Sequence, residues 1–438
     1  MKVLNFFLKN NNFKIHNGIK LYGFNSAWLL LEKILRLILG ILIGVWVAKY
    51  LGPEKFGEFS FAMVYVGLFT IIIGLGLDNI VVEELLNNKN KKEEIIATTF
   101  VLKLLSALII FVIILASLIF LNFSQIRSKL IFIFSLSLFI QSLDVIKFFF
   151  QAMVLSKYEA IASIIALIFS SFFKVYLILE GFGLIEFAYV YVFDIFLLAL
   201  GLIIFYNFKS GYNYHFLKFK KSIAINLLTR SWPLIISGLA ISLFMKVDQL
   251  MIDHFLDQTS LGYYAAAVKL SEAWYFVPII IANSFFPSLI NSKKVSEKLY
   301  NIRLSYLFKA MFWLSIIIAI IVTFFKDLII IKLYGESFLP ATKVLMIHIW
   351  SSVFVFMGMI SSNWMIIENL EKLYFKRTIY GLISNIILNL LLIPIFGIIG
   401  AAISTIISQS IVYYFSDLFN KQTIKLFVLK NKSFFSIK

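Results

Sequence analysis

A few ionisable residues lie inside stretches of this sequence that are otherwise apolar, and they are the residues best placed to do chemistry. An ionised side chain at the centre of a membrane helix costs about 2.5–3.5 kcal/mol, so each should face a polar cavity or an oppositely charged partner. Cations there could hold an anionic group, and carboxylates could bind H⁺ or Na⁺ or balance the cations. The candidates are Arg36, Lys246 and Lys269 for anion binding, and Asp248, Glu272 and Asp78 for ion coupling or charge balance. The alternative is pairing between helices, or extension of the side chain to the membrane surface.

A second group of residues could bend the helices that carry these charges. Proline removes a helix hydrogen bond and kinks the helix. We therefore predict kinks or gating points, for a cavity that opens to alternate sides, at Pro233, Pro278, Pro287, Gly74 and Gly76. Plain packing is the alternative, because glycine and proline are common in transmembrane helices.

Other kinds of chemistry find little support in the sequence. There is no cysteine, and the four histidines are not spaced as a metal pair, which predicts no metal site and no thiol chemistry. We find no phosphate-binding glycine-rich loop and no nucleophile motif, so we expect neither ATP hydrolysis nor a cofactor. The net charge of +17 could suggest nucleic acid. Cytoplasmic loops rich in Lys and Arg explain it better, and we expect no nucleic-acid partner.

The elements that position these residues are predicted to be membrane helices. Hydrophobic residues make up 61% of the 438 residues and charged residues 14%, whereas soluble domains have about 45–50% and about 25%. A spanning helix needs about 20 mainly apolar residues. This rule predicts about twelve spans, at 27–49, 57–78, 95–121, 129–151, 160–180, 186–206, 230–253, 264–290, 306–325, 343–367, 376–395 and 398–418. Two joins, at 181–183 and 394–397, are tight.

The loops predict the orientation and the division of the chain. Most loop Lys and Arg residues fall on the side that carries both termini, so we place both termini in the cytoplasm. The longest loop on that side, 207–229, separates an N-terminal six-helix lobe (1–206) from a C-terminal six-helix lobe with a short basic tail (230–438). Similar segments recur in the two halves. The predicted fold is therefore all-α and polytopic, with two pseudo-symmetric lobes around a central cavity.

Several motifs make the sequence similar to a known family. The most distinctive stretches are Ser231–Pro233, Asp248–Gln249, Gly262–Ala267 and Leu270–Tyr275, with Tyr50–Pro53, Gly74–Asp78, Asp144–Gln151, Ser156–Tyr158, Leu333–Gly335, Asn385–Pro394 and Gly397–Ala402. In these motifs the chain resembles the O-antigen flippases of the Wzx type, in the polysaccharide transporter branch of the MOP exporter superfamily. The likeness extends over nearly the whole chain.

The resemblance implies a function and a setting. Such proteins move undecaprenyl-pyrophosphate-linked oligosaccharide units, used for lipopolysaccharide or another surface polysaccharide, across the bacterial inner membrane. They are not enzymes. Implied partners are the lipid-linked oligosaccharide, membrane lipids, a polysaccharide polymerase and a chain-length regulator. Lys246 stands where the family often has Arg, which removes the planar fork that holds a phosphate with two hydrogen bonds.

Three other functions stay open at this point. A multidrug or other lipid exporter of the same superfamily would share the fold. A membrane-embedded polysaccharide polymerase should need a sizeable outer loop, and the predicted outer loops are short. A passive scaffold for the assembly machinery would tolerate loss of the buried charges.

Overall fold

The computed structural model describes residues 17–210 and 218–435, and within these ranges the chain is helical and has no strand. Eleven helices of the described chain are long and apolar enough to cross a membrane. The first, Asn25–Asn87, contains the two predicted spans 27–49 and 57–78, and each of the others coincides with one predicted span, three of which extend one residue past the end of the helix. The prediction of an all-α, multi-pass membrane protein is confirmed.

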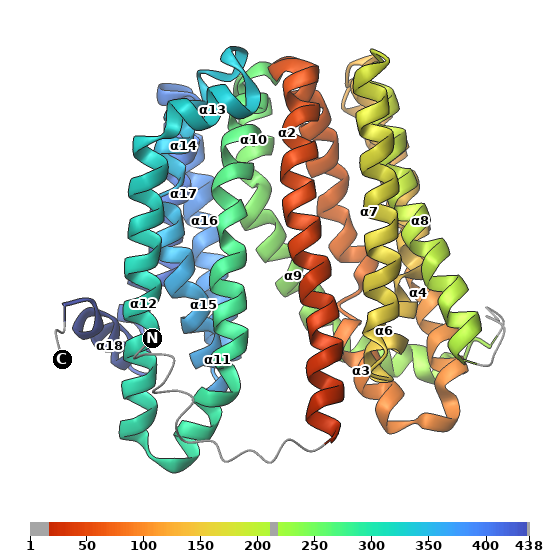
Figure 1. Cartoon of the computed structure of the whole chain (residues 1–438), viewed down its shortest axis with the longest axis vertical. Helices are drawn as coiled ribbons and strands as arrows, with labels where there is room; N and C mark the ends of the chain where they lie inside the picture. The colour runs from red at the N-terminus through yellow and green to blue at the C-terminus, as the bar shows by residue number, and fades with distance from the viewer. Residues whose placement is uncertain (1–16, 211–217, 436–438) are drawn as a thin grey trace. The chain divides into compact units, whose positions relative to one another are not determined.

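Contacts within the chain divide it into two compact units, Ile15–Lys246 and Val247–Lys438, called here the N-terminal and C-terminal units. Each is described by itself. In the N-terminal unit the helices run side by side (Figure 1). They are α2 (Asn17–Gly74), α3 (Asp78–Asn87), η1 (Lys89–Lys91), α4 (Lys92–Phe120), α5 (Gln125–Gln141), η2 (Ser142–Asp144), α6 (Val145–Ala152), α7 (Ser156–Leu179), α8 (Leu184–Ser210) and the first part of α9 (Lys221–Phe255).

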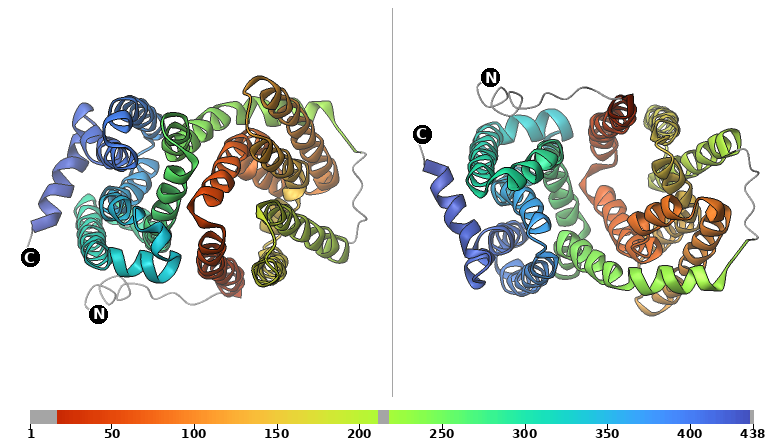
Figure 2. Two further views of the ribbon diagram at one scale, coloured as in Figure 1. Left: turned by 90° about the horizontal axis from the view of Figure 1, so that it is seen from above. Right: turned by 90° about the horizontal axis from the view of Figure 1, so that it is seen from below.

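The C-terminal unit begins within α9 and is a second helical bundle. Seen end-on in Figure 2, its helices cluster together, and α18 extends from the side of the bundle. The helices are α10 (Gln258–Glu272), η3 (Ala273–Tyr275), α11 (Phe276–Val295), α12 (Glu297–Phe324), α13 (Lys326–Tyr334), η4 (Glu336–Phe338), α14 (Ala341–His348), α15 (Ser351–Ile367), α16 (Glu371–Phe396), α17 (Ile398–Tyr413), η5 (Phe415–Phe419) and α18 (Ile424–Phe435).

Apolar side chains face outward along these helices, and small polar ones face inward. Ile109 of α4 is 61% exposed and Phe324 of α12 is 81% exposed, whereas Ser170 and Ser404 are fully buried. Water would make this pattern costly, but lipid is as apolar as the outward side chains. The surface is therefore suited to a bilayer.

Glycines mark the tight joins that the sequence predicts. The backbone of Gly52 has φ +75°, and this residue breaks α2 into two helical segments just before Pro53. Gly181 (φ +74°) and Gly397 (φ +59°) stand between α7 and α8 and between α16 and α17. These left-handed conformations are strained for residues with a side chain. Both predicted joins are confirmed.

One predicted boundary is wrong. The loop expected at 207–229 is shorter, because α8 runs to Ser210 and α9 already begins at Lys221. Residues 211–217 and both termini (1–16 and 436–438) lie outside the described residues. Polar residues interrupt the apolar ones in the first turns of α9 (Lys221, Ser222, Asn226 and Thr229), so the rule that counts continuous apolar stretches misses them. Arg230 of this segment pairs with Glu83 (2.6 Å) and Glu84 (3.5 Å) of α3, which stabilises the start of α9.

We expect Gly400→Ala to destabilise the join between α16 and α17. A Cβ atom at Gly400 would lie 2.2 Å from the carbonyl oxygen of Leu392, so backbone must move. Overpacking of this kind costs about 1–3 kcal/mol. The matched control is Gly67→Ala in α2, where a Cβ meets no described atom within 4 Å. Thermal denaturation in detergent compares the two variants, and equal melting temperatures would contradict the expectation.

Candidate functional site

The N-terminal unit holds a charge cluster between α2, α7 and α8. Arg36 of α2 donates from Nε to Glu32 Oε1 (2.9 Å) and from Nη2 to Ser163 Oγ of α7 (2.7 Å). Its Nη1 lies 3.4 Å from Asp194 Oδ2 of α8. Ser170 of α7 donates to the other Asp194 oxygen at 2.9 Å. We call Glu32, Arg36, Ser163, Ser170 and Asp194 the Arg36 cluster.

The Arg36 cluster joins helices and still leaves the cation accessible. The Arg36 side chain is 38% exposed, whereas the Glu32 and Asp194 side chains are 13% and 17% exposed. The two carboxylates already use part of the guanidinium's hydrogen-bonding capacity. The interhelix pairing that the sequence offered as an alternative is therefore present, and anion binding by Arg36 stays a prediction.

We expect Arg36→Gln to destabilise the N-terminal unit. The change leaves the largely buried carboxylates of Glu32 and Asp194 without their cation, and an unsatisfied charged group costs about 1–3 kcal/mol or more. Glu32→Gln in the same chain should restore part of the loss, because it removes one of the two stranded charges. Thermal unfolding of the single and double variants measures both effects. A double variant less stable than Arg36→Gln would show that the pairing is not the cause.

The C-terminal unit holds a second polar cluster around Asp248 of α9. Asp248 is only 5% exposed. The hydroxyl of Tyr264 on α10 donates to its Oδ2, and the backbone N–H of Gln249 donates to its Oδ1 at 2.8 Å. Tyr264 also lies 3.4 Å from the hydroxyl of Thr405 on α17. The cluster thus ties three helices of this unit together.

His348 of α14 lies beside Tyr264 and extends this polar cluster. Its ring is edge-on to the Tyr264 ring, with 6.2 Å between centroids. Its Nδ1 lies 3.0 Å from the hydroxyl of Ser271 on α10. We call Asp248, Tyr264, Thr405, Ser271 and His348 the Asp248 cluster. A buried carboxylate with a tyrosine and a histidine nearby is able to accept or release a proton, which is the chemistry that ion coupling needs.

The remaining charged candidates are partly buried and none of them is isolated. Lys246 lies on α9 two residues before Asp248, and Lys269 and Glu272 lie in the last turn of α10. Each takes part in a hydrogen bond or electrostatic interaction. Arg36 and Lys246 belong to the N-terminal unit, whereas Lys269, Asp248 and Glu272 belong to the C-terminal unit. The set of three anion-binding cations therefore stays a prediction from the sequence.

Asp78 has a different setting from the other candidates. The sequence puts it in the second predicted span, but α2 ends at Gly74 and Asp78 is the exposed first residue of α3. A carboxylate in a first helical turn interacts favourably with the helix dipole. Its predicted part in ion coupling is untested.

Of the predicted bending points, Gly74 and Gly76 fall at a real break and Pro278 follows a 3₁₀ turn, whereas Pro233 and Pro287 lie inside the continuous helices α9 and α11. Leu75 and Gly76 have φ of +52° and +59°, directly after the end of α2. A Cβ at Gly76 would lie 2.8 Å from Leu234 Cβ, so α9 approaches this turn closely beside Pro233. Pro278 and Pro287 lie in α11, which follows the 3₁₀ turn η3. Short 3₁₀ segments inside spans often mark hinges, so gating at these positions stays open as a prediction.

Sequence reasoning missed one buried ion pair of the N-terminal unit. Arg127 of α5 donates to Glu58 of α2 at 2.8 Å, and its guanidinium lies 4.2 Å from the centre of the Phe61 ring. The two residues are 69 positions apart, and nothing in their spacing announces the pairing. The available signal was that both residues lie at the start of a predicted span, Glu58 in the second (57–78) and Arg127 just before the fourth (129–151).

The described residues contain no group of three or more His, Cys, Asp or Glu side chains that could hold a metal ion. Residues 23–293 match the family described as "Polysaccharide biosynthesis protein".

The chain belongs to the polysaccharide biosynthesis protein family. One relative, from Haloferax volcanii, is named "Probable low-salt glycan biosynthesis flippase Agl15"; it is 25% identical over 40% of this chain and 38% of its own length. The chain spans between 29% and 53% of the length of three curated relatives that it matches.

Solved structures share the fold of most of this chain. One is "Lipid II flippase MurJ, inward closed conformation", with TM-score 0.73, 20% identity, and coverage of 94% of this chain and 90% of that one. Another is an inward-facing multidrug resistance MATE family transporter of the MOP superfamily, with TM-score 0.71, 15% identity, and coverage of 89% and 95%. The predicted MOP-like fold is confirmed.

Proposed function

We propose that this protein is a flippase that moves a lipid-linked oligosaccharide across the membrane. Membership of the polysaccharide biosynthesis family is the observation that carries the proposal. The fold supports it, because the same fold occurs in MurJ, which is named as a lipid II flippase. The relative Agl15 is also named as a glycan biosynthesis flippase.

The finer substrate is an undecaprenyl-pyrophosphate-linked repeat unit of the O-antigen type. The proposed setting is the bacterial inner membrane with both termini in the cytoplasm, and the proposed partners are a polysaccharide polymerase and a chain-length regulator. Arg36, Lys246 and Lys269 would contact the pyrophosphate, whose charges suit cations placed in a low-dielectric site.

The proposed mechanism is alternating access. The headgroup would enter a cavity from the cytoplasm while the lipid tail stays in the bilayer. Asp248 and Glu272 would bind the coupling ion, H⁺ or Na⁺. One charge that moves through 100 mV is worth about 2.3 kcal/mol, enough to drive a cycle in one direction.

Deletion with complementation tests the proposal directly. The lipid-linked repeat unit is labelled on each side of the membrane in cells with and without the gene, and again after the wild-type gene is returned. We expect the unit to accumulate on the cytoplasmic side after deletion and to redistribute on complementation. An unchanged distribution in the deletion strain would refute the flippase function.

A second candidate, a multidrug exporter, is favoured by one observation, the likeness to the MATE transporter fold. It predicts that deletion raises drug sensitivity and leaves the lipid-linked glycan unchanged. The same strains therefore separate the two functions.

A further inference from the structure

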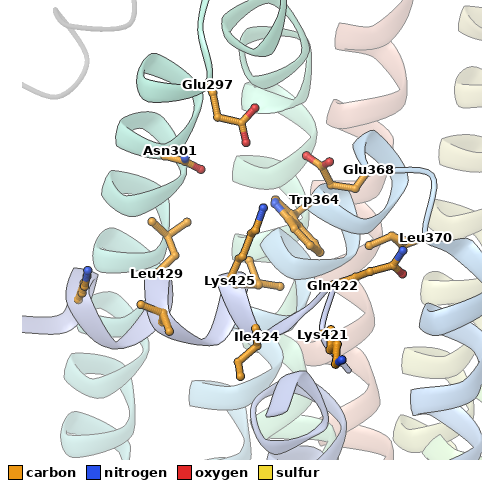
Figure 3. Close-up of a pocket in the computed structure, with 13 residues that line it drawn as sticks. Glu297, Asn301, Trp364, Glu368, Leu370, Lys421, Gln422, Ile424, Lys425 and Leu429 are labelled. Carbon is orange, nitrogen blue, oxygen red and sulfur yellow. The ribbon is translucent and has the colours of Figure 1, made fainter. Parts of the chain in front are cut away.

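A pocket of about 680 Å³ opens in the C-terminal unit beside its last helix, α18. Its walls come from the first turns of α12 (Glu297, Asn301), the end of α15 (Trp364, Glu368) and α18 itself (Lys425, Leu429). Figure 3 shows the carboxylates of Glu297 and Glu368 and the ammonium end of Lys425 directed into the same space, next to the Trp364 ring. None of these residues belongs to the Arg36 cluster or the Asp248 cluster.

The lining of the pocket carries a surplus of positive charge. Three lysines line it: Lys421, Lys425 and Lys432. Of its two carboxylates, Glu368 is already paired with Lys293 at 2.8 Å, which leaves Glu297 to offset three ammonium groups. Such a lining attracts an anion.

α18 is built as a helix that lies along a membrane surface. With 12 residues it is too short to span a bilayer, and Figure 1 shows it lying across the direction of α12. Ile424 and Val428 are 45% and 44% exposed. Both residues line the pocket together with Lys421, Lys425 and Lys432, so exposed apolar and basic side chains lie next to one another on this helix. Short helices that expose both kinds of side chain are typical of the lipid headgroup region.

The helix is held firmly enough to form a lasting site. Lys430 donates to Asp417 of η5 at 2.6 Å, and both side chains are fully buried. The Phe434 ring stacks on Phe312 of α12 with 4.2 Å between centroids, and Trp313 donates to the Phe434 carbonyl at 3.3 Å. The pocket is therefore a built feature of this unit.

We propose that this pocket binds the headgroup of an anionic phospholipid. Its phosphate would lie against Lys425 and the neighbouring lysines, while Glu297 and Asn301 hydrogen-bond to headgroup hydroxyls such as those of glycerol. The acyl chains would pass Ile424 into the bilayer. Basic pockets between membrane helices at a charged membrane surface recognise lipid phosphates in this way. None of the pocket residues is among those proposed to contact the transported substrate or the coupling ion.

Lipid titration of the purified full-length protein tests the site. Native mass spectrometry in detergent measures binding of short-chain phosphatidylglycerol, with phosphatidylcholine, phosphatidylethanolamine and free glycerol phosphate as comparison ligands. We expect phosphatidylglycerol to bind most tightly. Each lysine near an anionic headgroup contributes about fivefold, so the triple variant Lys421→Gln, Lys425→Gln, Lys432→Gln should bind on the order of a hundredfold more weakly.

Matched controls keep the outcome clear. Lys332→Gln removes an exposed lysine of α13, at the other end of the same unit (Figure 1), and should leave binding unchanged. Glu297→Gln should strengthen phosphatidylglycerol binding, because it removes a like charge.

Equal binding of phosphatidylcholine, or equal losses in the triple variant and Lys332→Gln, overturns the proposal. Preference for phosphatidylethanolamine that is lost in Glu297→Gln assigns the pocket to a zwitterionic headgroup instead, and tight binding of free glycerol phosphate excludes a lipid site. If the triple variant does not fold, Lys425→Gln alone carries the test, with about a fivefold loss expected.

Discussion

Replacing Asp248 by asparagine is expected to abolish the ion dependence of transport. Asp248 is 5% exposed and is held by hydrogen bonds from Tyr264 and from the Gln249 backbone. Asparagine keeps the shape of the side chain but cannot gain or lose the charge that coupling requires. A charge driven through 100 mV is worth about 2.3 kcal/mol, which corresponds to roughly fiftyfold in an equilibrium. We expect a loss of that order in gradient-driven flipping, measured in proteoliposomes with an imposed pH or Na⁺ gradient.

Tyr264→Phe separates coupling from structure. It keeps the carboxylate and removes only the hydroxyl that donates to it, so the ion dependence should survive. The protein should lose about 1–3 kcal/mol of stability, because a buried carboxylate oxygen loses its donor. If Asp248→Asn flips substrate with an unchanged response to the gradient, the coupling role is wrong. If both variants lose stability and transport in parallel, the Asp248 cluster is structural.

Much of the fold can be predicted from this sequence because a lipid environment allows few backbone structures. A stretch of about 20 apolar residues has few alternatives to a spanning helix, and glycines such as Gly397 then mark where one helix must end. The rule fails at helix ends that mix polar and apolar residues. Residues 221–229 are predicted to be a loop, yet they begin α9, because polar residues such as Lys221 and Asn226 interrupt the apolar stretch that the rule counts.

The site is less accessible to sequence reasoning because its partners are remote in the chain. Ionisable residues in apolar stretches correctly mark Arg36 and Asp248 as polar positions between helices, of which Asp248 is buried and Arg36 is 38% exposed. The Arg36 partners on other helices, Ser163 and Asp194, lie 127 and 158 residues away, and no local spacing reveals them. Nothing in the local sequence pairs Tyr264 with His348, and only the packing of α10 and α14 brings them beside one another.

The C-terminal helix α18 contains a second buried contact that sequence reasoning does not predict. Counting loop charges treats Lys430 as one of several solvated lysines in a basic tail. In the structure its side chain is fully buried. The physical reason is Asp417, a carboxylate at the end of the last span that is also fully buried and so requires a cation.

Lys430→Met is expected to be the most destabilising single change in the C-terminal unit. The Lys430 ammonium donates to Asp417 Oδ2 and to the Tyr413 carbonyl, both at 2.6 Å. Burial lowers the pKa of Lys430 below its usual range, and the Asp417 carboxylate partly offsets this shift. Methionine fills a similar volume but leaves Asp417 as a buried charge with no cation. Breaking a buried pair in this way costs about 3–5 kcal/mol.

The double variant Lys430→Met, Asp417→Leu distinguishes the stranded charge from lost packing. Apolar replacement of both partners is often neutral or stabilising, so the double variant should recover most of the stability. Lys432→Met, at an exposed position of the same helix, should stay within about 0.5 kcal/mol of wild type. Denaturant unfolding of the detergent-purified protein gives all three values. If Lys430→Met is as stable as Lys432→Met, the buried pair does not hold α18 in place, and the pocket beside α18 has no fixed wall. If Lys430→Met loses stability strongly and the double variant restores it, the buried pair holds α18 against α12.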